Sequence, residues 1–413
     1  MLKRKNYWLL FAILLLSLTS LSPSMDLNQT DDPPLMNEYQ SQSQSSSLRQ
    51  KGEPAHLRIS VSLSYKEFRE LQNISSNFEL SSGVTVELNN LGEAAGDDAL
   101  MNELTIGNSP DIVMTEAHHI RELAQQGYLL PVDVYRSSPG GTPLTPLLPL
   151  LQWNGYAWGM PLDVDPYIFV YSPKVMKELG AEALPRTLDQ WTRLLEQSLK
   201  KPGTYVLAMD AGSPYGVSAF LESVGSSQFP GSREALDWIG QARSSIYLTD
   251  GQDNGVWNML REGKIAAAVL PLSEWQESRG GDLVAEAPWM GDPAGEEMLY
   301  CRSFALSAQT RSPEAAADWL SYITSARSQL DWLASTGRLP AAEELYRGGL
   351  PGGDSLPFDT VSLLTGGGGL AGEPQAGWSE ITSAAGLLLT GKLDAAGYIE
   401  ALSNSPEGEE NGP

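Results

Sequence analysis

Two carboxylates, Asp163 and Asp165, are the first candidates for chemistry in this chain. They lie two residues apart in the run MPLDVDPY, just after the aromatic run WNGYAWG. Residues two apart in an extended segment share a face, so both side chains can bind sugar hydroxyls or a cation. Carboxylates on either side of a glycosidic bond also act as acid and base. A structural role or a solvated turn is the alternative, and the residues alone leave these possibilities open.

Tryptophan is the second chemical signal, with 11 residues in the chain. A sugar site needs flat apolar faces for the C–H side of the ring, together with polar groups for its hydroxyls. Core packing is the alternative for each aromatic side chain. The candidates are Trp153, Trp158, Trp275, Trp289 and Trp378, with Tyr215 in the turn GSPYG as a similar case.

The remaining motifs favour neither a metal site nor an enzyme. His118 and His119 are adjacent, so on a helix they point about 100° apart and do not easily share a metal ion. The run DGQDNG starts like a calcium loop, but Arg261 stands where the twelfth position needs glutamate. The sequence has no G-x-S-x-G or H-E-x-x-H motif. We therefore expect no metal, no cofactor and no catalytic residue.

Composition indicates a globular protein of about two domains, which 413 residues allow. The net charge of −24, from 51 acidic and 27 basic residues, argues against nucleic acid, whose binding depends on clustered Lys and Arg. It also disfavours an anionic membrane surface or a strongly anionic ligand. Cys301 is the one cysteine, so no intrachain disulfide can form, and we expect a small buried apolar side chain.

The N-terminus has the pattern of an export signal. A basic stretch, KRK, precedes an apolar run and then small residues, with Ser20 or Ser24 at the expected cleavage position. The apolar run is too short for an ordinary transmembrane helix, and an uncleaved anchor is the alternative. We assign residues 1–24 to a signal peptide, residues 25–54 to a flexible Ser/Gln-rich linker and residues 403–413 to an acidic tail.

Strand and helix patterns alternate along the rest of the chain. A strand at 57–63, a helix with apolar residues from Phe68 to Phe78, and a strand at 84–88 predict parallel strands with a right-handed crossover. Proline, glycine and leucine at 137–149 suggest a surface loop. The other predicted elements are strands at 110–114 and 205–209, and helices at 100–106, 120–126, 187–198, 214–224, 232–243, 378–390 and 393–402.

The segment 302–341, RSFALSAQTRSPEAAADWLSYITSARSQLDWLASTGRLPA, predicts a strand and two helices. Pro313 stands at the first position of the first helix, and Gly337 follows the second. In its residue types and their order, the segment resembles the extracellular solute-binding proteins of bacterial ABC importers, of the maltose-binding-like class. The runs PDIVMTEAHHIRELAQQGYLLPVD and MLREGKIAAAVLPLSEW resemble the same family, which extends the likeness over residues 57–402.

This resemblance implies an α/β fold of the type II periplasmic-binding-protein kind, with two lobes, a hinge and a cleft between the lobes. We expect residues 55–162 and 300–340 in lobe 1, and residues 163–299 and 341–402 in lobe 2. The chain would cross between the lobes at 160–166 and return at 287–293. The segment 302–341 would then be scaffold and not part of the site.

The function that the resemblance implies is that of a receptor. It would capture a small ligand, by preference a carbohydrate, and deliver it to an ABC transporter permease in the membrane. We expect a monomer, extracellular or at the cell surface, without the cysteine that usually anchors such lipoproteins. The alternatives are an exported glycan hydrolase using Asp163 and Asp165, and a ligand sensor for a membrane kinase.

The expected ligand-binding residues combine the chemical candidates with positions that the resemblance points to. In the family, aromatic side chains at the places of Trp275 and Trp378 stack on sugar. An aromatic residue is also common where this chain has Thr115 and Glu116, which weakens a maltodextrin assignment. The full set is Ser64, Tyr65, Thr115, Glu116, Asp163, Asp165, Tyr215, Trp275, Trp289 and Trp378.

Overall fold

A computed structural model describes residues 55–92, 96–105, 109–135, 140–226, 230–249, 255–288, 299–359 and 377–403. These residues belong to a compact unit that begins at Glu53. The predicted signal peptide and linker, Trp289, and the tail beyond Ser403 lie outside the described residues. Among the described residues, we find no helix with the length and apolar character needed to cross a membrane.

The fold begins with the predicted strand–helix–strand unit. Its elements are β1 (His56–Val61), α2 (Tyr65–Ser82) and β2 (Thr85–Asn90). The two strands are parallel, which confirms the prediction. Ser64 caps the helix, since its side chain accepts from the backbone of Glu67 while the Glu67 carboxylate accepts from the backbone of Ser64. Gly83 ends the helix at φ 74°, a conformation that suits glycine.

The sheet of the first lobe is completed by one more parallel strand and one late antiparallel strand. β3 (Ile112–Glu116) lies parallel to β1, and β12 (Leu299–Ser307) runs antiparallel to β3. Helices that cover this half or follow its strands are α3 (Gly96–Thr105), η2 (Ala117–His119), α4 (Ile120–Gln125), α5 (Val132–Tyr135), α13 (Pro313–Ile323) and α14 (Ala326–Thr336). The segment 302–341 therefore returns to strands built some 200 residues earlier.

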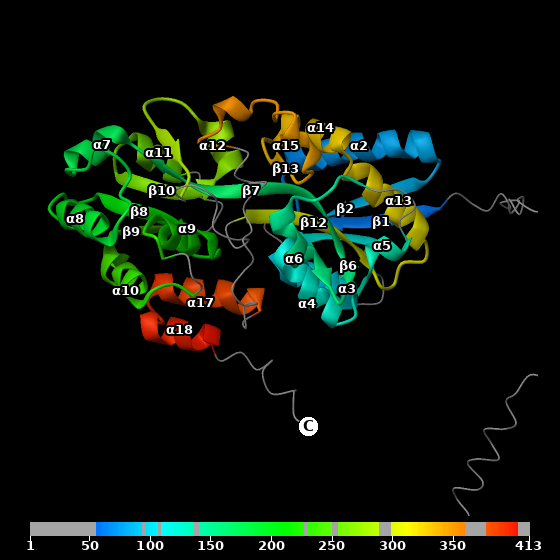
Figure 1. Cartoon of the computed structure of the whole chain (residues 1–413), viewed down its shortest axis with the longest axis horizontal. Coiled ribbons are helices and arrows are strands. Elements are labelled where there is room, and N and C mark those ends of the chain that lie inside the picture. The colour runs from blue at the N-terminus through cyan, green and yellow to red at the C-terminus, as the bar shows by residue number, and fades with distance from the viewer. Residues whose placement is uncertain are drawn as a thin grey trace, which may run out of the picture. The chain divides into compact units, whose positions relative to one another are not determined.

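One long strand, β7 (Gly159–Tyr171), joins the two halves of the sheet. Its residues 159–166 pair with β12, and its residues 167–171 pair with β10 (Ile265–Pro271). In Figure 1, β7 runs from the half that contains β1 and β2 into the half that contains β8 and β10. The predicted crossing at 160–166 thus lies inside a continuous strand. We call the half with β1, β2, β3 and β12 the first lobe, and the half with β8, β9 and β10 the second lobe.

The second lobe continues from β7 through parallel strands and surrounding helices. Its strands are β8 (Tyr205–Asp210), β9 (Ile246–Thr249), β10 and β11 (Val284–Glu286). Its helices are α7 (Pro173–Glu178), α8 (Leu188–Ser198), α9 (Tyr215–Ser223), α10 (Arg233–Ala242), α11 (Gly255–Arg261), α12 (Leu272–Ser278), α17 (Trp378–Thr390) and α18 (Ala395–Ser403).

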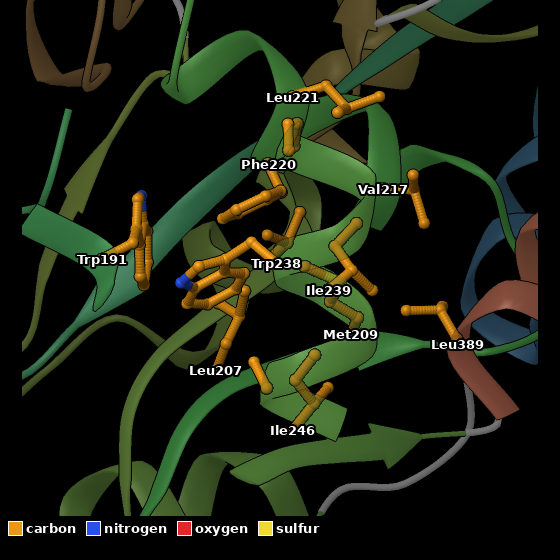
Figure 2. Close-up of a cluster of buried hydrophobic side chains, with 14 of the residues drawn as sticks. Trp191, Leu207, Met209, Val217, Phe220, Leu221, Trp238, Ile239, Ile246 and Leu389 are labelled. Atoms are coloured by element: carbon orange, nitrogen blue, oxygen red, sulfur yellow. The ribbon is translucent and has the colours of Figure 1, made fainter. Parts of the chain in front are cut away.

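The core of the second lobe is aromatic at its centre. The rings of Phe220 and Trp238 stack with centroids 4.6 Å apart, and Trp191 meets Trp238 edge-on at 5.7 Å. Figure 2 shows these rings among aliphatic side chains of β8, α9 and α10, with Leu389 of α17 nearby. The C-terminal helices therefore bury their apolar faces in this core, and the start of α17 is held beside α9.

The prediction of a surface loop at 137–149 is wrong for its second half. Leu144 and Leu147 are fully buried, because the short helices η3 (Thr145–Leu147) and α6 (Leu148–Leu151) turn their leucines into the core. The backbone of Leu144 donates to the carbonyl of Ala341, and that of Glu343 donates to Thr142. These bonds attach residues 341–343 to first-lobe segments, although the division into lobes at 340 stays a prediction. The remaining short elements of the described residues are β4 (Leu129–Leu130), β5 (Gln152–Trp153), β6 (Tyr156–Ala157), β13 (Leu339–Pro340), α15 (Glu344–Arg347) and η6 (Gly353–Ser355), together with η4 (Arg243–Ser245) in the second lobe.

Candidate ligand-binding cleft

A cleft of about 1010 Å³ lies between the lobes. The first lobe contributes the start of α2 and the end of β3, and the second lobe contributes the starts of α9, α12 and α17. Residues of the crossing strands form part of its lining, including Asp165 and Tyr167 of β7 and Tyr300 of β12. Its volume is within the usual range for a small-molecule site, at the large end.

A buried network of charges lies beside the crossing strands. The Arg302 guanidinium contacts both the Asp163 carboxylate and Glu67 Oε1, the latter at 2.9 Å. Arg338 Nε donates to the same Glu67 oxygen at 2.8 Å, and Arg338 Nη1 lies 2.8 Å from Asp165 Oδ2. Burial would raise the pKa of Glu67, but the two guanidinium groups hold it well below its ordinary value. We call these five residues the charge network.

Asp163 lies at the buried end of this network and not in the cleft. Its side chain is 0% exposed, and Trp332 Nε1 donates to Asp163 Oδ2 at 2.8 Å in addition to the bonds from Arg302. The carboxylate is thus engaged by protein groups and does not line the cleft, so the structural role is the one its contacts support, and a role toward a ligand stays a prediction. Asp163 fixes Arg302 and α14 against β7.

Asp165 lies two residues further along β7 and lines the cleft. The backbone N–H and the hydroxyl of Ser273 donate to its two oxygens at 2.8 and 2.6 Å. Burial raises the pKa of Asp165, although Arg338 and Ser273 act in the opposite direction. Since Ser273 belongs to α12 and Arg338 follows α14, this carboxylate joins the two lobes at the floor of the cleft.

The second-lobe wall carries an aromatic ring and a carboxyl group in contact. Trp257 Nε1 of α11 donates to Glu274 Oε2 of α12 at 3.2 Å. Burial raises the pKa of Glu274 to about 7, and the neighbouring Asp165 and Asp210 carboxylates add to this shift. The bond from Trp257 and the charge of Arg338 lower it by less. At neutral pH this side chain can therefore accept or donate a hydrogen bond.

An aromatic cluster closes another part of the cleft. Tyr215, at the start of α9, stacks on Tyr167 with ring centroids 4.7 Å apart, and its hydroxyl donates to the Glu116 carboxylate. Trp378, at the start of α17, stacks on His118 with centroids 3.7 Å apart. Burial would raise the pKa of Glu116, yet His118 and the bond from Tyr215 lower it.

The structure brings five of the ten predicted ligand-binding residues to the cleft. Ser64, Glu116, Asp165, Tyr215 and Trp378 line it. Thr115 lines an adjoining cavity of about 230 Å³. Their roles toward a ligand stay predictions.

Three other predicted residues lie away from the cleft lining or cannot be placed. Tyr65 is the first residue of α2 and is 79% exposed to solvent, outside the lining of the cleft. Trp275 packs beside Trp257, with ring centroids 6.4 Å apart, and does not line the cleft either. Trp289 lies outside the described residues. The indole of Trp158 donates to the carbonyl of Trp153, and the two rings pack together, which supports the core role for this pair.

Sequence reasoning missed several cleft residues. Arg338 and Thr336 belong to the segment 302–341, so the expectation that this segment is only scaffold is wrong. A signal was available in Arg338, a cation directly after the glycine that ends a helix. Other missed residues with polar or aromatic side chains include Glu67, Asp210, Trp257, Glu274 and Tyr300.

Metal and thiol chemistry find no support in the part of the chain that the structure describes. It contains no group of three His, Cys, Asp or Glu side chains able to hold a metal ion. Cys301 is fully buried in β12, as predicted, and burial raises the pKa of its thiol. Such a thiol is inert toward most reagents.

Two α/β lobes joined by crossing strands, with a polar and aromatic cleft between them, define a binding protein of the hinged, two-lobe class. The family model for bacterial extracellular solute-binding proteins matches residues 73–351, and the chain belongs to this family. This confirms the resemblance noted in the sequence. The maltodextrin-binding protein MdxE of Bacillus subtilis is 24% identical over 315 residues, covering 69% of this chain and 73% of that protein.

Solved structures agree with the fold. The GacH receptor of Streptomyces glaucescens superposes with a TM-score of 0.63 at 15% identity, covering 84% of this chain and 96% of that chain. The galacto-N-biose-/lacto-N-biose I-binding protein of Bifidobacterium longum gives 0.63 at 16% identity, covering 85% and 96%. Both comparisons confirm the expected two-lobe architecture.

Proposed function

We propose that this protein is a receptor that captures a carbohydrate in the interlobe cleft and delivers it to an ABC transporter. The observation that carries the proposal is the lining of the cleft, in which the aromatic side chains of Tyr215 and Trp378 border the same space as the carboxyl groups of Asp165 and Glu274. Apolar ring faces with a few fixed polar groups are what a sugar needs. The similar proteins named above bind maltodextrin, acarbose or lacto-N-biose, which supports the same ligand class here.

We propose binding without turnover. The hydrolase alternative needs two carboxyl groups that face the glycosidic bond, and Asp163 is buried in bonds to Arg302 and Trp332. Asp165 therefore lacks the partner that this alternative assigned to it. Family membership supports the same conclusion, because the family is one of solute-binding proteins.

A thermal-shift screen of the purified protein against neutral mono- and oligosaccharides tests both proposals. We expect one sugar class to raise the melting temperature in a saturable way, since a ligand that binds only the folded state stabilises it. Chromatography of the same mixtures should show unchanged sugar. Asp165→Asn should weaken the shift, while the matched Asp237→Asn, on an exposed face of α10, should not. Release of a shorter sugar would contradict the receptor function.

Delivery and location form the second part of the proposal. The protein would act as a monomer outside the cell, released or anchored through its N-terminal segment, with a membrane permease as its partner. Mass spectrometry of the exported protein should show cleavage near Ser20 or Ser24 and no lipid. Copurification with a permease from cross-linked membranes would support the transport role, whereas recovery of a membrane kinase instead would favour the sensor alternative.

A further inference from the structure

Four side chains from opposite lobes meet in a compact cluster beside the cleft. Glu116 and His118 come from the end of β3 and from η2 in the first lobe, and Tyr215 and Trp378 come from the starts of α9 and α17 in the second lobe. We call these four residues the interlobe clasp.

Three contacts cross from lobe to lobe within the clasp, one of them between the Tyr215 hydroxyl and His118 Nδ1 at 3.4 Å. The Tyr215 hydroxyl donates to the Glu116 carboxylate, and the His118 ring lies on the Trp378 ring with centroids 3.7 Å apart and planes inclined by only 13°. His118 Nδ1 lies 3.3 Å from Glu116 Oε1, so the same carboxylate holds both the tyrosine and the histidine. His118 Nε2 has no hydrogen-bond partner among the described residues.

Three of the four side chains of the clasp are almost fully shielded from water, and the fourth, Glu116, is 17% exposed. The side chain of His118 is 7% exposed, Tyr215 is 2% exposed and Trp378 is 7% exposed. Separation of the lobes at this point would expose an indole face and a phenol to water and would break a charge-assisted hydrogen bond. Apolar burial and such a bond both favour the closed arrangement.

The two second-lobe residues of the clasp, Tyr215 and Trp378, are anchored by different parts of the protein. Tyr215 packs on Tyr167 and Tyr300, which belong to the two crossing strands. Trp378 belongs to α17, which is built on the second-lobe core. His118 does not line the cleft, whereas Trp378 does, so the imidazole supports the indole from outside the ligand space. Opening of the cleft would therefore separate His118 from Trp378.

We propose that the interlobe clasp holds the lobes together in the absence of ligand, and that His118 is the positioning residue that sets Trp378 in the cleft wall. The contacts are made entirely between protein groups, so each of them favours closure whether or not a solute also contacts the cleft wall. Part of the free energy of closure is then built into the chain and is not supplied by the ligand. This inference does not depend on the identity of the ligand.

Spin labels on both sides of the clasp test the inference without any ligand. Gln125→Cys on α4 and Ser383→Cys on α17 are exposed positions, and the buried Cys301 thiol will not compete for the label. We expect a narrow distance distribution for the otherwise wild-type full chain. His118→Ala should shift the closed-to-open ratio by about two- to tenfold toward longer distances, the range that one aromatic pair supports.

Matched variants separate the roles of the ring and the charge. His56→Ala removes a histidine that pairs with Glu87 on an exposed surface, and should leave the distribution unchanged. His118→Phe keeps a ring on Trp378 and should widen the distribution less than His118→Ala. If His118→Ala does not fold, Tyr215→Phe removes only the hydroxyl that bonds Glu116 and carries the same test. A broad distribution in the wild-type chain, or equal distributions in the His118 and His56 variants, would overturn the proposal.

Discussion

Glu67 and Glu274 line the same cleft, yet their pKa values move in opposite directions. Glu67 lies between Arg302 and Arg338, which more than offset its burial and lower its pKa. Glu274, on the other lobe, has the indole of Trp257 as a donor and other carboxylates nearby, and burial raises its pKa to about 7. On the first-lobe side, Glu67 is thus held in the charged form by two guanidinium groups, while the second-lobe side keeps a carboxyl group that can still change its charge.

The different pKa shifts of Glu67 and Glu274 distinguish carboxyl groups that are bound by the protein from carboxyl groups that can still bind a ligand. A carboxylate held by two guanidinium groups has few lone pairs left, and its removal takes one buried partner from both Arg302 and Arg338. A protonated carboxyl group on the opposite wall can donate to a sugar oxygen and can ionise when a donor approaches. Polar residues of the first kind should govern stability, and residues of the second kind should govern recognition.

The largest effect is expected at Arg302, in the centre of the charge network. Arg302→Met leaves the fully buried Asp163 carboxylate without its cation, and loss of one partner of a buried pair costs about 3–5 kcal/mol of unfolding free energy. Urea unfolding measures this loss. The matched variant Arg233→Met breaks an exposed pair with Asp237 on α10 and should cost less than about 1 kcal/mol. Equal losses in the two variants would show that the network contributes no more than a surface ion pair.

A pH-dependent effect is expected at Glu274. Its pKa is higher in the folded chain than the ordinary 4.5, so the folded state binds more protons between pH 4.5 and about 7, and this group's contribution to stability falls as pH rises through that window. Glu274→Gln removes the dependence, and the variant should gain up to about 3 kcal/mol relative to wild type between pH 4.5 and 8.

Unfolding free energies of both proteins across this pH range measure the Glu274 difference. Glu196→Gln, at an exposed position of α8, is the matched control and should leave the pH profile unchanged. If the profiles of wild type and Glu274→Gln run parallel, the carboxyl group is as ionised at pH 6 as an exposed one, and the contrast with Glu67 disappears.

The sequence predicted the secondary-structure elements, and the side chains that share a face of a strand, better than it predicted how deeply each side chain is buried. Asp163 and Asp165 were expected on one face of an extended segment, and both do contact charged groups of the same network. Period-two alternation gives a face but does not show which partners cover it. Asp163 is covered by Arg302 and Trp332, which follow it by 139 and 169 residues. Those contacts exist only after the chain has returned to the first lobe.

The same limit explains why Trp257 and Glu274 were missed. Trp275 attracted attention as an aromatic residue after a predicted strand, but adjacent residues on a helix point about 100° apart. Glu274 therefore lines the cleft and Trp275 does not. Trp257 stands on the neighbouring helix α11, and only the packing of α11 beside α12 brings it to Glu274.

The smallest effect distinguishes Trp257 from Trp275 in ligand binding. Trp257 lines the cleft and donates to Glu274, so Trp257→Ala should weaken binding of the sugar identified by the thermal-shift screen by about 1–3 kcal/mol, as measured by calorimetric titration. It should also lower the stability of the empty protein, because this side chain is 5% exposed and packs in the core. Trp275→Ala is the matched control, because it removes an indole that packs on Trp257 but does not line the cleft. It should change the affinity by less than about 1 kcal/mol. A larger loss of affinity in Trp275→Ala than in Trp257→Ala would indicate that the sugar binds on the other side of α12. Glu274 would then not be the residue of this wall that contacts the ligand.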